Sequence, residues 1–196
     1  MIKLALTGNI ASGKTLVETF LKEQGIVTVD ADKIVHDLLK NNVEIKNQVI
    51  ELFQNFDILD KTGEISRLKV GRIVFKDKGK LKKLENILHP AVKLQIEQFF
   101  KENKNIAVAV IPLLFEANLE NMFDYILLVT ADFDTRVKRL MARSNLTYEE
   151  AMDRINSQMP QEDKVAKSDF IIDNSSTPEK TKSQVIDVLG KLKSLI

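Results

Sequence analysis

The amino-acid sequence predicts an α/β fold, in which helices cover both faces of one five-stranded parallel sheet. Short apolar runs alternate with longer segments of helical periodicity, which is the order of elements that builds a parallel sheet. Most of the runs are continuously apolar, as is typical of strands that are buried on both faces. The expected strands are Ile2–Leu6, Ile26–Val29, Ile106–Ile111, Tyr125–Val129 and Phe170–Ile172.

Segments of helical periodicity separate these strands. Gly25 follows the first segment, at the position where helices commonly end in a left-handed residue. A further short helix is expected from Thr147, because the sequence Thr-Tyr-Glu-Glu over residues 147–150 is a capping box. The other expected helices beside the strands are Lys14–Gln24, Lys33–Leu39, Asp132–Arg143 and Glu179–Leu195.

The alternation of strands and helices is interrupted once. Between Val29 and Ile106 the only patterns are helical, at Val43–Phe56 and Leu81–Phe100, so we expect a helical insertion on the sheet. The 196 residues are enough to bury one sizeable core, which favours a single domain of three α/β/α layers. Its expected parts are a core of about 1–30, 104–135 and 166–196, a helical lobe of about 31–103, and a smaller helical part of about 136–165.

The composition excludes several classes of site. The chain has no cysteine, which excludes disulfides, thiolate nucleophiles and cysteine-based metal sites. It has only two histidines, which argues against a histidine-rich metal site. With 29 Lys and Arg against 28 Asp and Glu, the net charge of +1 gives no electrostatic reason to expect nucleic acid or a membrane as a partner.

The apolar runs are too short for membrane or export signals. None of them approaches the roughly 18 residues that a bilayer-spanning helix needs. The first run, Ile2–Leu6, is also shorter than the apolar region of a signal peptide. We therefore expect a cytoplasmic protein that is a monomer or a weak homo-oligomer.

A glycine-rich segment directly follows the first strand. Residues 8–15 match the phosphate-binding (Walker A) pattern GxxxxGK(S/T), with a strand before them and a helix after them. Glycines let the backbone curl so that its N–H groups surround phosphate oxygens, and the helix N-terminus adds positive charge. The lysine reaches the β- and γ-phosphates, and the threonine hydroxyl can ligate Mg²⁺. The expected phosphate-binding residues are Gly8, Asn9, Ile10, Ala11, Ser12, Gly13, Lys14 and Thr15, with Thr15 as the expected metal ligand.

This loop is shared by GTPases, large ATPases and small-molecule kinases. A GTPase would carry an (N/T)KxD motif after a late strand, whereas residues 103–106 read Asn-Lys-Asn-Ile and precede a strand. A large ATPase would carry an aspartate at the end of an apolar strand, whereas Ile106–Ile111 is followed by Pro112. A small-molecule kinase therefore remains, and the alternatives are a nucleoside monophosphate kinase and a non-catalytic nucleotide-binding regulator.

Two aspartates follow the second apolar run. Asp30 and Asp32 are expected to face the phosphate loop, because ligands of open parallel sheets gather at the carboxyl ends of the strands. Either carboxylate could accept a proton from a substrate hydroxyl or hold Mg²⁺ through water. Either could also cap the helix that follows. We expect one aspartate to cap this helix and the other to take part in the reaction.

A set of motifs recurs in order along essentially the whole chain. They are TGNIASGKT (7–15), VDAD (29–32), ILHP (87–90), PLLFE (112–116), RLMAR (139–143), RINSQMP (154–160) and IIDN (171–174). Together they resemble the motifs of the dephospho-coenzyme A kinase family. The resemblance implies a P-loop nucleotide-kinase fold with a parallel core, a helical substrate lobe and a mobile lid. It also implies transfer of the γ-phosphoryl group of ATP to the ribose 3′-hydroxyl of dephospho-CoA, with ATP as co-substrate and Mg²⁺ as cofactor.

The same resemblance implies roles for individual residues. Asp32 matches the catalytic base of the family, and Lys14 matches the lysine that holds the phosphates. Arg143 and Arg154 match arginines at the entrance of the lid and in its RIxxQM motif, where they would stabilise the charge on the transferred group. Arg139 and Asn174 match positions at the ATP nucleotide, and the acceptor is expected to contact Asp32, His36, His89, Pro112, Leu113, Leu114 and Glu116.

The two histidines carry separate expectations. Members of the family commonly have an arginine four residues after the second aspartate of the DAD motif, where this chain has His36. If that arginine holds the phosphates of the acceptor, His36 replaces it only partly and in a pH-dependent way. His89 precedes Pro90, which favours an extended residue at 89 and a helix that starts after it. We expect a mainly structural role for His89, with substrate contact as the lesser one.

Two groups of basic residues remain. The spacing of Arg136, Arg139 and Arg143 places them on one helix face. For Arg136 we expect a solvated position beside the aspartates at 132 and 134. Residues 61–83 hold nine Lys and Arg, most of which we expect to form a solvated face, with a minority near the diphosphate of the acceptor.

Overall fold

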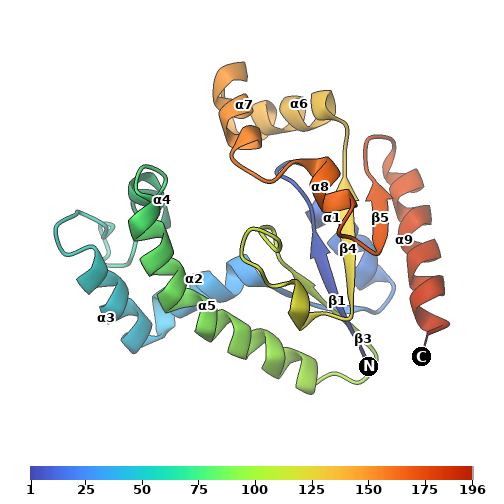
Figure 1. The fold of residues 1–196 in the computed structure, drawn as a ribbon, viewed down its shortest axis with the longest axis horizontal. Helices are drawn as coiled ribbons and strands as arrows, with labels where there is room; N and C mark the ends of the chain where they lie inside the picture. Colours follow the sequence, from blue (N-terminus) through green and yellow to red (C-terminus); the bar gives the residue numbers. More distant parts are fainter. Residues whose placement is uncertain (196) are drawn as a thin grey trace. The chain divides into compact units, whose positions relative to one another are not determined.

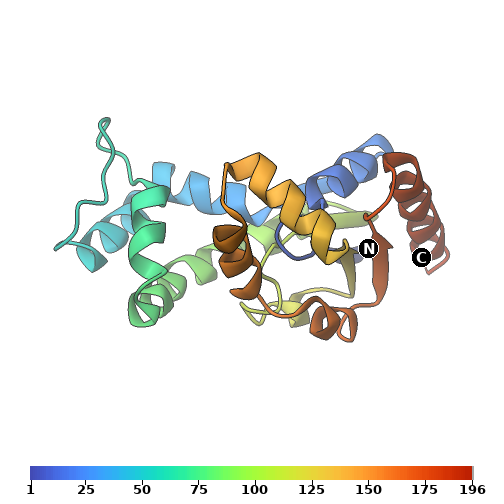
Figure 2. The same cartoon turned by 90° about the horizontal axis from the view of Figure 1, so that it is seen from above.

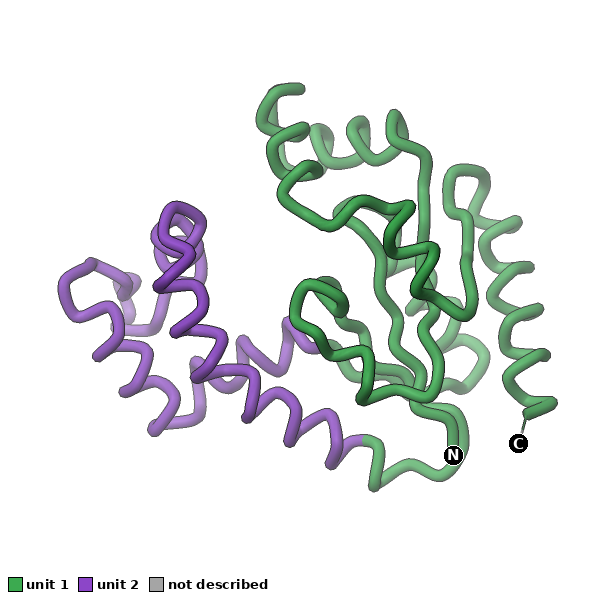
Figure 3. The backbone as a smooth tube through the Cα atoms, in the orientation of Figure 1, with its two compact units in different colours: residues 1–30, 100–196 green, residues 31–99 purple. Residues whose placement is uncertain are grey.

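The structure is a computed structural model that describes residues 1–195, which form two compact units (Figure 3). Unit 1 combines Met1–Asp30 with the chain from Phe100 onward, and unit 2 is Ala31–Phe99. Unit 1 contains every strand of the sheet, whereas the regular elements of unit 2 are helices. The chain therefore leaves unit 1 after the second strand and returns to it before the third.

The sheet of unit 1 confirms the predicted α/β class. All five strands run parallel in the order β2-β3-β1-β4-β5, so β1 lies at the centre. The observed ends differ from the expected ones by one residue, and Asp30 is the last residue of its strand. The strands are β1 (Ile2–Thr7), β2 (Val27–Asp30), β3 (Ile106–Val110), β4 (Tyr125–Thr130) and β5 (Phe170–Asp173).

Helices cover both faces of this sheet. On one face α1 and α9 pack against each other, while α8 contacts β4 on the opposite face (Figures 1 and 2). The helices α6 and α7 pack together after β4, and α7 begins with the expected capping box between Thr147 and Glu150. The helical elements of unit 1 are α1 (Lys14–Glu23), η1 (Glu120–Met122), α6 (Phe133–Ser144), α7 (Tyr148–Asn156), α8 (Gln161–Val165) and α9 (Pro178–Lys193).

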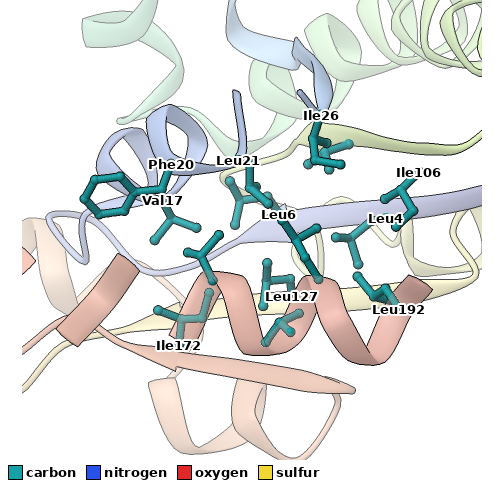
Figure 4. Packing of buried hydrophobic residues seen from close by; sticks show 14 of the residues in the cluster. Leu4, Leu6, Val17, Phe20, Leu21, Ile26, Ile106, Leu127, Ile172 and Leu192 are labelled. Atoms are coloured by element: carbon teal, nitrogen blue, oxygen red, sulfur yellow. The ribbon is translucent and has the colours of Figure 1, made fainter. Parts of the chain in front are cut away.

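The main hydrophobic core lies between the sheet and the pair α1 and α9. Leu4 and Leu6 of the central strand are fully buried in it, together with Leu127 of β4 (Figure 4). Leu21 of α1 and Leu192 of α9 close this core from the helical side. Because β1 is fixed by neighbours on both edges and by this core, the loop that follows it starts from a rigid support.

Unit 2 is built from helices around its own buried apolar side chains, among them Leu38, Ile45 and Phe53. The helix α3 begins at the cap residue Asn42, and α4 begins at the cap residue Ser66. The helix α4 falls inside the basic stretch of residues 61–83, and no helix was predicted for its residues. The helices are α2 (Ala31–Asn41), α3 (Val43–Leu52), α4 (Arg67–Val74) and α5 (Lys78–Lys101), and the last two residues of α5 belong to unit 1.

The expectation of a helix start after Pro90 is wrong. The helix α5 runs through Pro90 without a break, and His89 is helical instead of extended. Leu88, Val92 and Ile96 are buried on both sides of the proline. The burial of this continuous apolar face outweighs the roughly 3 kcal/mol by which a proline in a helix interior is disfavoured.

Replacement of Pro90 by alanine is therefore expected to stabilise the protein. Pro90 is exposed, so the loss of its ring costs little packing, and alanine restores a helical hydrogen bond. The free energy of unfolding of Pro90→Ala should rise by about 2 kcal/mol, because the gain is partly offset by the freer unfolded chain. Urea unfolding followed by circular dichroism measures this change.

The exposed Lys82 in the same helix provides the control, and Lys82→Ala should change the free energy of unfolding by less than about 0.5 kcal/mol. A Pro90→Ala protein that is less stable than the parent would contradict the explanation by the apolar face.

Candidate active site

The loop between β1 and α1 has a backbone that only glycine allows at two positions. Gly8, Ala11 and Gly13 have positive φ angles of 155°, 62° and 98°. A Cβ atom on Gly13 would lie 1.9 Å from the Asn174 side-chain nitrogen, and one on Gly8 would lie 2.4 Å from the Val129 carbonyl oxygen. The two glycines of the pattern are therefore required by close contacts of the loop with β4 and with the residue that follows β5.

Asn174 is hydrogen-bonded to the backbone of this loop. Its side-chain nitrogen donates a 2.8 Å hydrogen bond to the Ser12 carbonyl, and its side-chain oxygen accepts one of 2.9 Å from the Thr181 hydroxyl. Arg139 donates a 2.9 Å hydrogen bond to the Asn174 carbonyl. Asn174 is buried, and its side-chain amide makes these hydrogen bonds to other residues of the protein. A contact of Asn174 with the adenine of ATP stays a prediction.

A cavity of about 220 Å³ lies over the second half of the loop. The Lys14 ammonium donates to the carbonyls of Gly8 at 2.7 Å and Asn9 at 3.1 Å, which keeps it folded along the loop. The helix α1 starts beside this cavity, and it has neither a side-chain cap nor an acidic residue in its first turn. The cavity is lined by Ala11, Gly13, Lys14, Thr15, Arg139 and Arg143.

The electrostatics of this cavity suit an anion. Three cationic side chains, those of Lys14, Arg139 and Arg143, meet an uncapped helix N-terminus there. The Nη1 atom of Arg139 is buried and has no hydrogen-bond partner in the described part of the chain. A phosphate group would supply the acceptor that this nitrogen lacks.

The segment after α7 is hydrogen-bonded to the first half of the loop. The Asn9 side-chain nitrogen donates to the Met159 carbonyl at 2.8 Å, and the Ile10 amide donates to Oε1 of Gln158 at 2.7 Å. Ile10 also packs with the small apolar cluster between α6 and α7. The part of the chain expected to act as a lid is thereby attached to the phosphate loop in this conformation.

Glu116 supports the same segment. Its Oε1 atom accepts a 3.1 Å hydrogen bond from the Met159 amide and lies 2.8 Å from the ammonium of Lys164. The Lys164 side chain is fully buried, and its ammonium makes no hydrogen bond within residues 1–195, so the ion pair is its contact with the carboxylate. The electrostatic attraction between Glu116 and Lys164 of α8 therefore helps to hold the segment before α8 in place.

Comparison with known proteins decides the family. The family model described as dephospho-CoA kinase matches residues 2–179. This chain belongs to the dephospho-CoA kinase family. A dephospho-CoA kinase from Listeria innocua serovar 6a is 41% identical over 192 residues, which cover 96% of each chain.

Solved structures agree with this assignment. TT1252 from Thermus thermophilus has a TM-score of 0.85 at 32% identity, and the match covers 97% of both chains. A dephospho-CoA kinase from Campylobacter jejuni has a TM-score of 0.70 at 31% identity, with 99% of this chain and 98% of that chain covered. The family resemblance and the kinase class predicted from the sequence are confirmed.

The segment between β3 and η1 contains the PLLFE motif, residues 112–116, which was expected to line the acceptor pocket. Leu114 is fully buried, so it packs in the protein interior, whereas Leu113 is exposed. Pro112 and Glu116 are half-buried. Of the two leucines expected at the acceptor, Leu113 is thus the one that solvent reaches.

The expectation of a solvated Arg136 is wrong. Only 6% of Arg136 is exposed, because its neighbours Val137 and Leu140 bring this part of α6 into the contact with α7. Burial lowers the pKa of its guanidinium, and the charges of Glu162 and Asp132 oppose that change. Arg139 and Arg143 line the phosphate cavity, whereas Arg136 lines a different one. Arg154 is exposed on α7.

The remaining expected residues lie in unit 2. Asp32 is exposed in the first turn of α2, two residues after the end of β2. His36 lines a cavity of about 190 Å³ together with Lys40 and Arg67, and the same cavity includes Asp60 and Glu64.

His89 is half-buried within α5. The expectation that it mainly supports the structure, with substrate contact as the lesser role, stays a prediction.

Several functional candidates were missed from the sequence. Gln158 lies inside the RINSQMP motif, so the motif could have indicated it, but only the arginine of the motif was predicted to have a function. Lys164 gave no signal, because its burial is a tertiary effect. Lys40 and Arg67 gave only the weak signal of positive charge, and their position beside His36 depends on the packing of unit 2.

Across residues 1–195 there is no cluster of three or more His, Cys, Asp or Glu side chains that could hold a metal ion. In the same residues, none of the helices is both long and apolar enough to cross a membrane.

The close contact at Gly13 yields a testable prediction. Gly13→Ala should lower the affinity for ATP by about tenfold or more, because the new methyl group displaces Asn174 and the φ angle of 98° strains alanine. Isothermal titration with ATP measures the affinity, and thermal unfolding shows whether the variant is folded.

Gly71 in α4 is the matched control, since a Cβ atom there meets nothing within 4 Å. Gly71→Ala should bind ATP like the parent. An unchanged ATP affinity in a folded Gly13→Ala protein would contradict the proposed need for glycine.

Proposed function

We propose that this chain transfers the γ-phosphoryl group of ATP to the 3′-hydroxyl of the ribose of dephospho-CoA, which gives coenzyme A and ADP. The observation that carries the proposal is the cavity over the glycine loop, where Lys14, Thr15, Arg139 and Arg143 meet the N-terminus of α1. Membership of the dephospho-CoA kinase family supplies the acceptor. This reaction is the last step of coenzyme A synthesis.

ATP would place its phosphates on the loop of residues 8–13. Loop amides and the start of α1 would bind the phosphate oxygens, and Lys14 would turn from the Gly8 and Asn9 carbonyls to the β- and γ-phosphates. Arg139 would donate its unpaired Nη1 to the nucleotide. The bonds from Asn174 and Gln158 would keep the loop open for this ligand, because they hold its backbone from outside the cavity.

The residues at this cavity fit a magnesium ion bound mainly by phosphates. Thr15 contributes an exposed hydroxyl on the cavity wall, and Mg²⁺ in kinases commonly keeps few protein ligands beside water and phosphate oxygens. We propose Thr15 as the protein ligand, with Asp30 or Asp32 acting through water. The ion, when bound, neutralises charge that develops on the phosphates.

The transfer itself would depend on a base and on lid arginines. Asp32 is exposed in the first turn of α2, and its carboxylate would accept the proton of the ribose hydroxyl as that oxygen attacks the γ-phosphorus. Arg143 and Arg154 would stabilise the charge that spreads over the transferred group. Arg143 already lines the phosphate cavity.

The acceptor would be held by basic residues of unit 2. His36, Lys40 and Arg67 border one cavity, and together they offer the positive charge that an arginine would supply at position 36 in relatives. The neighbouring Asp60 and Glu64 moderate this charge. We therefore propose that Arg67 contacts the diphosphate of dephospho-CoA.

The exposed Leu113, the half-buried Pro112 and the half-buried Glu116 are proposed to line the acceptor path. We further propose a cytoplasmic protein that is a monomer or a weak homo-oligomer.

Mass spectrometry of dephospho-CoA after incubation with the protein, ATP and Mg²⁺ tests the proposal. We expect a product with the mass of one added phosphate, and fragmentation should place that phosphate at the 3′ position of the ribose. Chelation of the metal by EDTA should abolish the product. ATP binding without any product would indicate a regulator. Phosphate transfer to nucleoside monophosphates instead of dephospho-CoA would indicate a different kinase.

The role of Asp32 can be tested separately. Asp32→Asn should retain ATP binding and lose turnover by about 10²–10⁴-fold, because the amide cannot accept the proton. Steady-state assays with ATP and dephospho-CoA measure the turnover. The exposed Asp37 in the same helix is the matched control, and Asp37→Asn should be active. Turnover near that of the parent in Asp32→Asn would remove Asp32 as the base.

Arg67→Gln should raise the KM for dephospho-CoA by about tenfold and leave kcat almost unchanged, because a charged hydrogen bond to bound substrate is lost. The same kinetic assay measures both constants. Arg72→Gln, on the same helix but outside this cavity, should leave the KM unchanged. A fall in kcat at constant KM would place Arg67 elsewhere in the reaction.

A further inference from the structure

A second cavity of about 450 Å³ lies apart from the phosphate cavity. The two cavities share no lining residue. The lining comes from Asn9 of the glycine loop, the start of α6, the end of α7, the connecting loop and the start of α8. Figure 1 shows the chain passing through α6, α7 and α8 in turn. The lining includes Phe133, Arg136, Ile155, Gln158, Met159 and Gln161.

Arg136 is a buried cation whose Nε atom has no hydrogen-bond partner among residues 1–195. Its Nε atom is buried with no hydrogen-bond acceptor, and no carboxylate of the described residues lies within 4.0 Å of its guanidinium. The guanidinium carbon lies 5.9 Å from the centre of the Phe133 ring. A buried donor without an acceptor is costly, so the Nε atom of Arg136 favours a ligand with acceptor oxygens.

Two glutamines of the lining add donor groups, beside the carboxylates of Asp132 and Glu162 and the Asn9 side-chain oxygen, which are acceptors. The Oε1 atom of Gln158 accepts from the Ile10 amide at 2.7 Å, and that of Gln161 accepts from the Ala131 amide at 3.3 Å. Each bond uses the oxygen of the side chain and leaves its NH₂ group as a donor. Two glutamine NH₂ groups thus accompany the guanidinium in the lining.

Charge and shape narrow the class of ligand. Asp132 and Glu162 also line the cavity, so a phosphate dianion would meet two like charges beside the single arginine. A guanidinium matches the two oxygens of a carboxylate. Ile155 and Met159 give the cavity apolar walls beside Phe133, and its volume lies in the range of small-molecule sites.

We propose that this cavity is a binding site for a small organic monocarboxylate. The carboxylate pairs with Arg136 and with the amide donors, and the apolar body of the ligand packs on Phe133, Ile155 and Met159. The cavity shares no lining residue with the one over Lys14 and Thr15, but it borders the glycine loop at Asn9.

Methyl NMR of the full chain tests the site, because Met159 lies in the lining and the chain has only five methionines. The protein is labelled with ¹³C-methyl methionine, and its Met159 signal is assigned with Met159→Leu. Sodium benzoate is the probe, and a saturable shift of the Met159 signal is expected, also in the presence of a non-hydrolysable ATP analogue. Benzamide, the uncharged analogue, should give no such shift.

Arg136→Gln should weaken benzoate binding by about tenfold or more. Lys138→Gln removes the same charge from an exposed position on α6 and should leave binding unchanged. Glu162 is exposed at the cavity, so Glu162→Gln should tighten binding by about threefold and keeps the test valid if Arg136→Gln does not fold.

Three results would overturn the proposal. The first is a Met159 signal that does not respond to benzoate, which would mean that the cavity holds water alone. The second is an equal response to benzamide. The third is benzoate binding that is unaffected by both Arg136→Gln and Glu162→Gln.

Discussion

The contact between Asn174 and the backbone at Gly13 fixes the phosphate loop in its shape. Asn174 follows β5, and its backbone amide bonds to the Thr130 carbonyl at the end of β4 while its side chain bonds to Ser12 after β1. One buried residue thereby joins, through its backbone and its side chain, the carboxyl ends of three neighbouring strands. Because a hydrogen-bonded amide fits against the loop only where the loop has no Cβ atom, the glycine is a requirement of packing as much as of phosphate binding.

A second attachment holds the other end of the loop. The bonds from Asn9 and Ile10 to residues 158–159 depend in turn on Glu116, which binds the Met159 amide and the buried Lys164. Removal of the carboxylate would leave a buried ammonium without a counter-charge, which is a large penalty. In this conformation the glycine loop and the expected lid are therefore joined by hydrogen bonds.

The sequence predicted the sheet well because buried parallel strands leave continuous apolar runs, and it predicted the phosphate loop because the pattern is local. It failed where tertiary contacts decide. At Pro90, burial of an apolar face on both sides outweighed a local rule. The aspartates near Arg136 in the sequence suggested an exposed side chain, but the packing of α6 against α7 buries it. The positions of Arg67 beside His36 and of Gln158 at the loop depend on segments distant in sequence.

The insertion of unit 2 has a consequence for how the protein folds. The strands β2 and β3 are neighbours in the sheet, with Asp30 beside Val110, although all of unit 2 separates them in the sequence. Pairing them requires the closure of a long loop, which is entropically costly and slows folding. A unit 2 that becomes compact first brings its own two ends closer and shortens this loop. The edge strand β2, which carries Asp30 and leads to Asp32, would then join the sheet late.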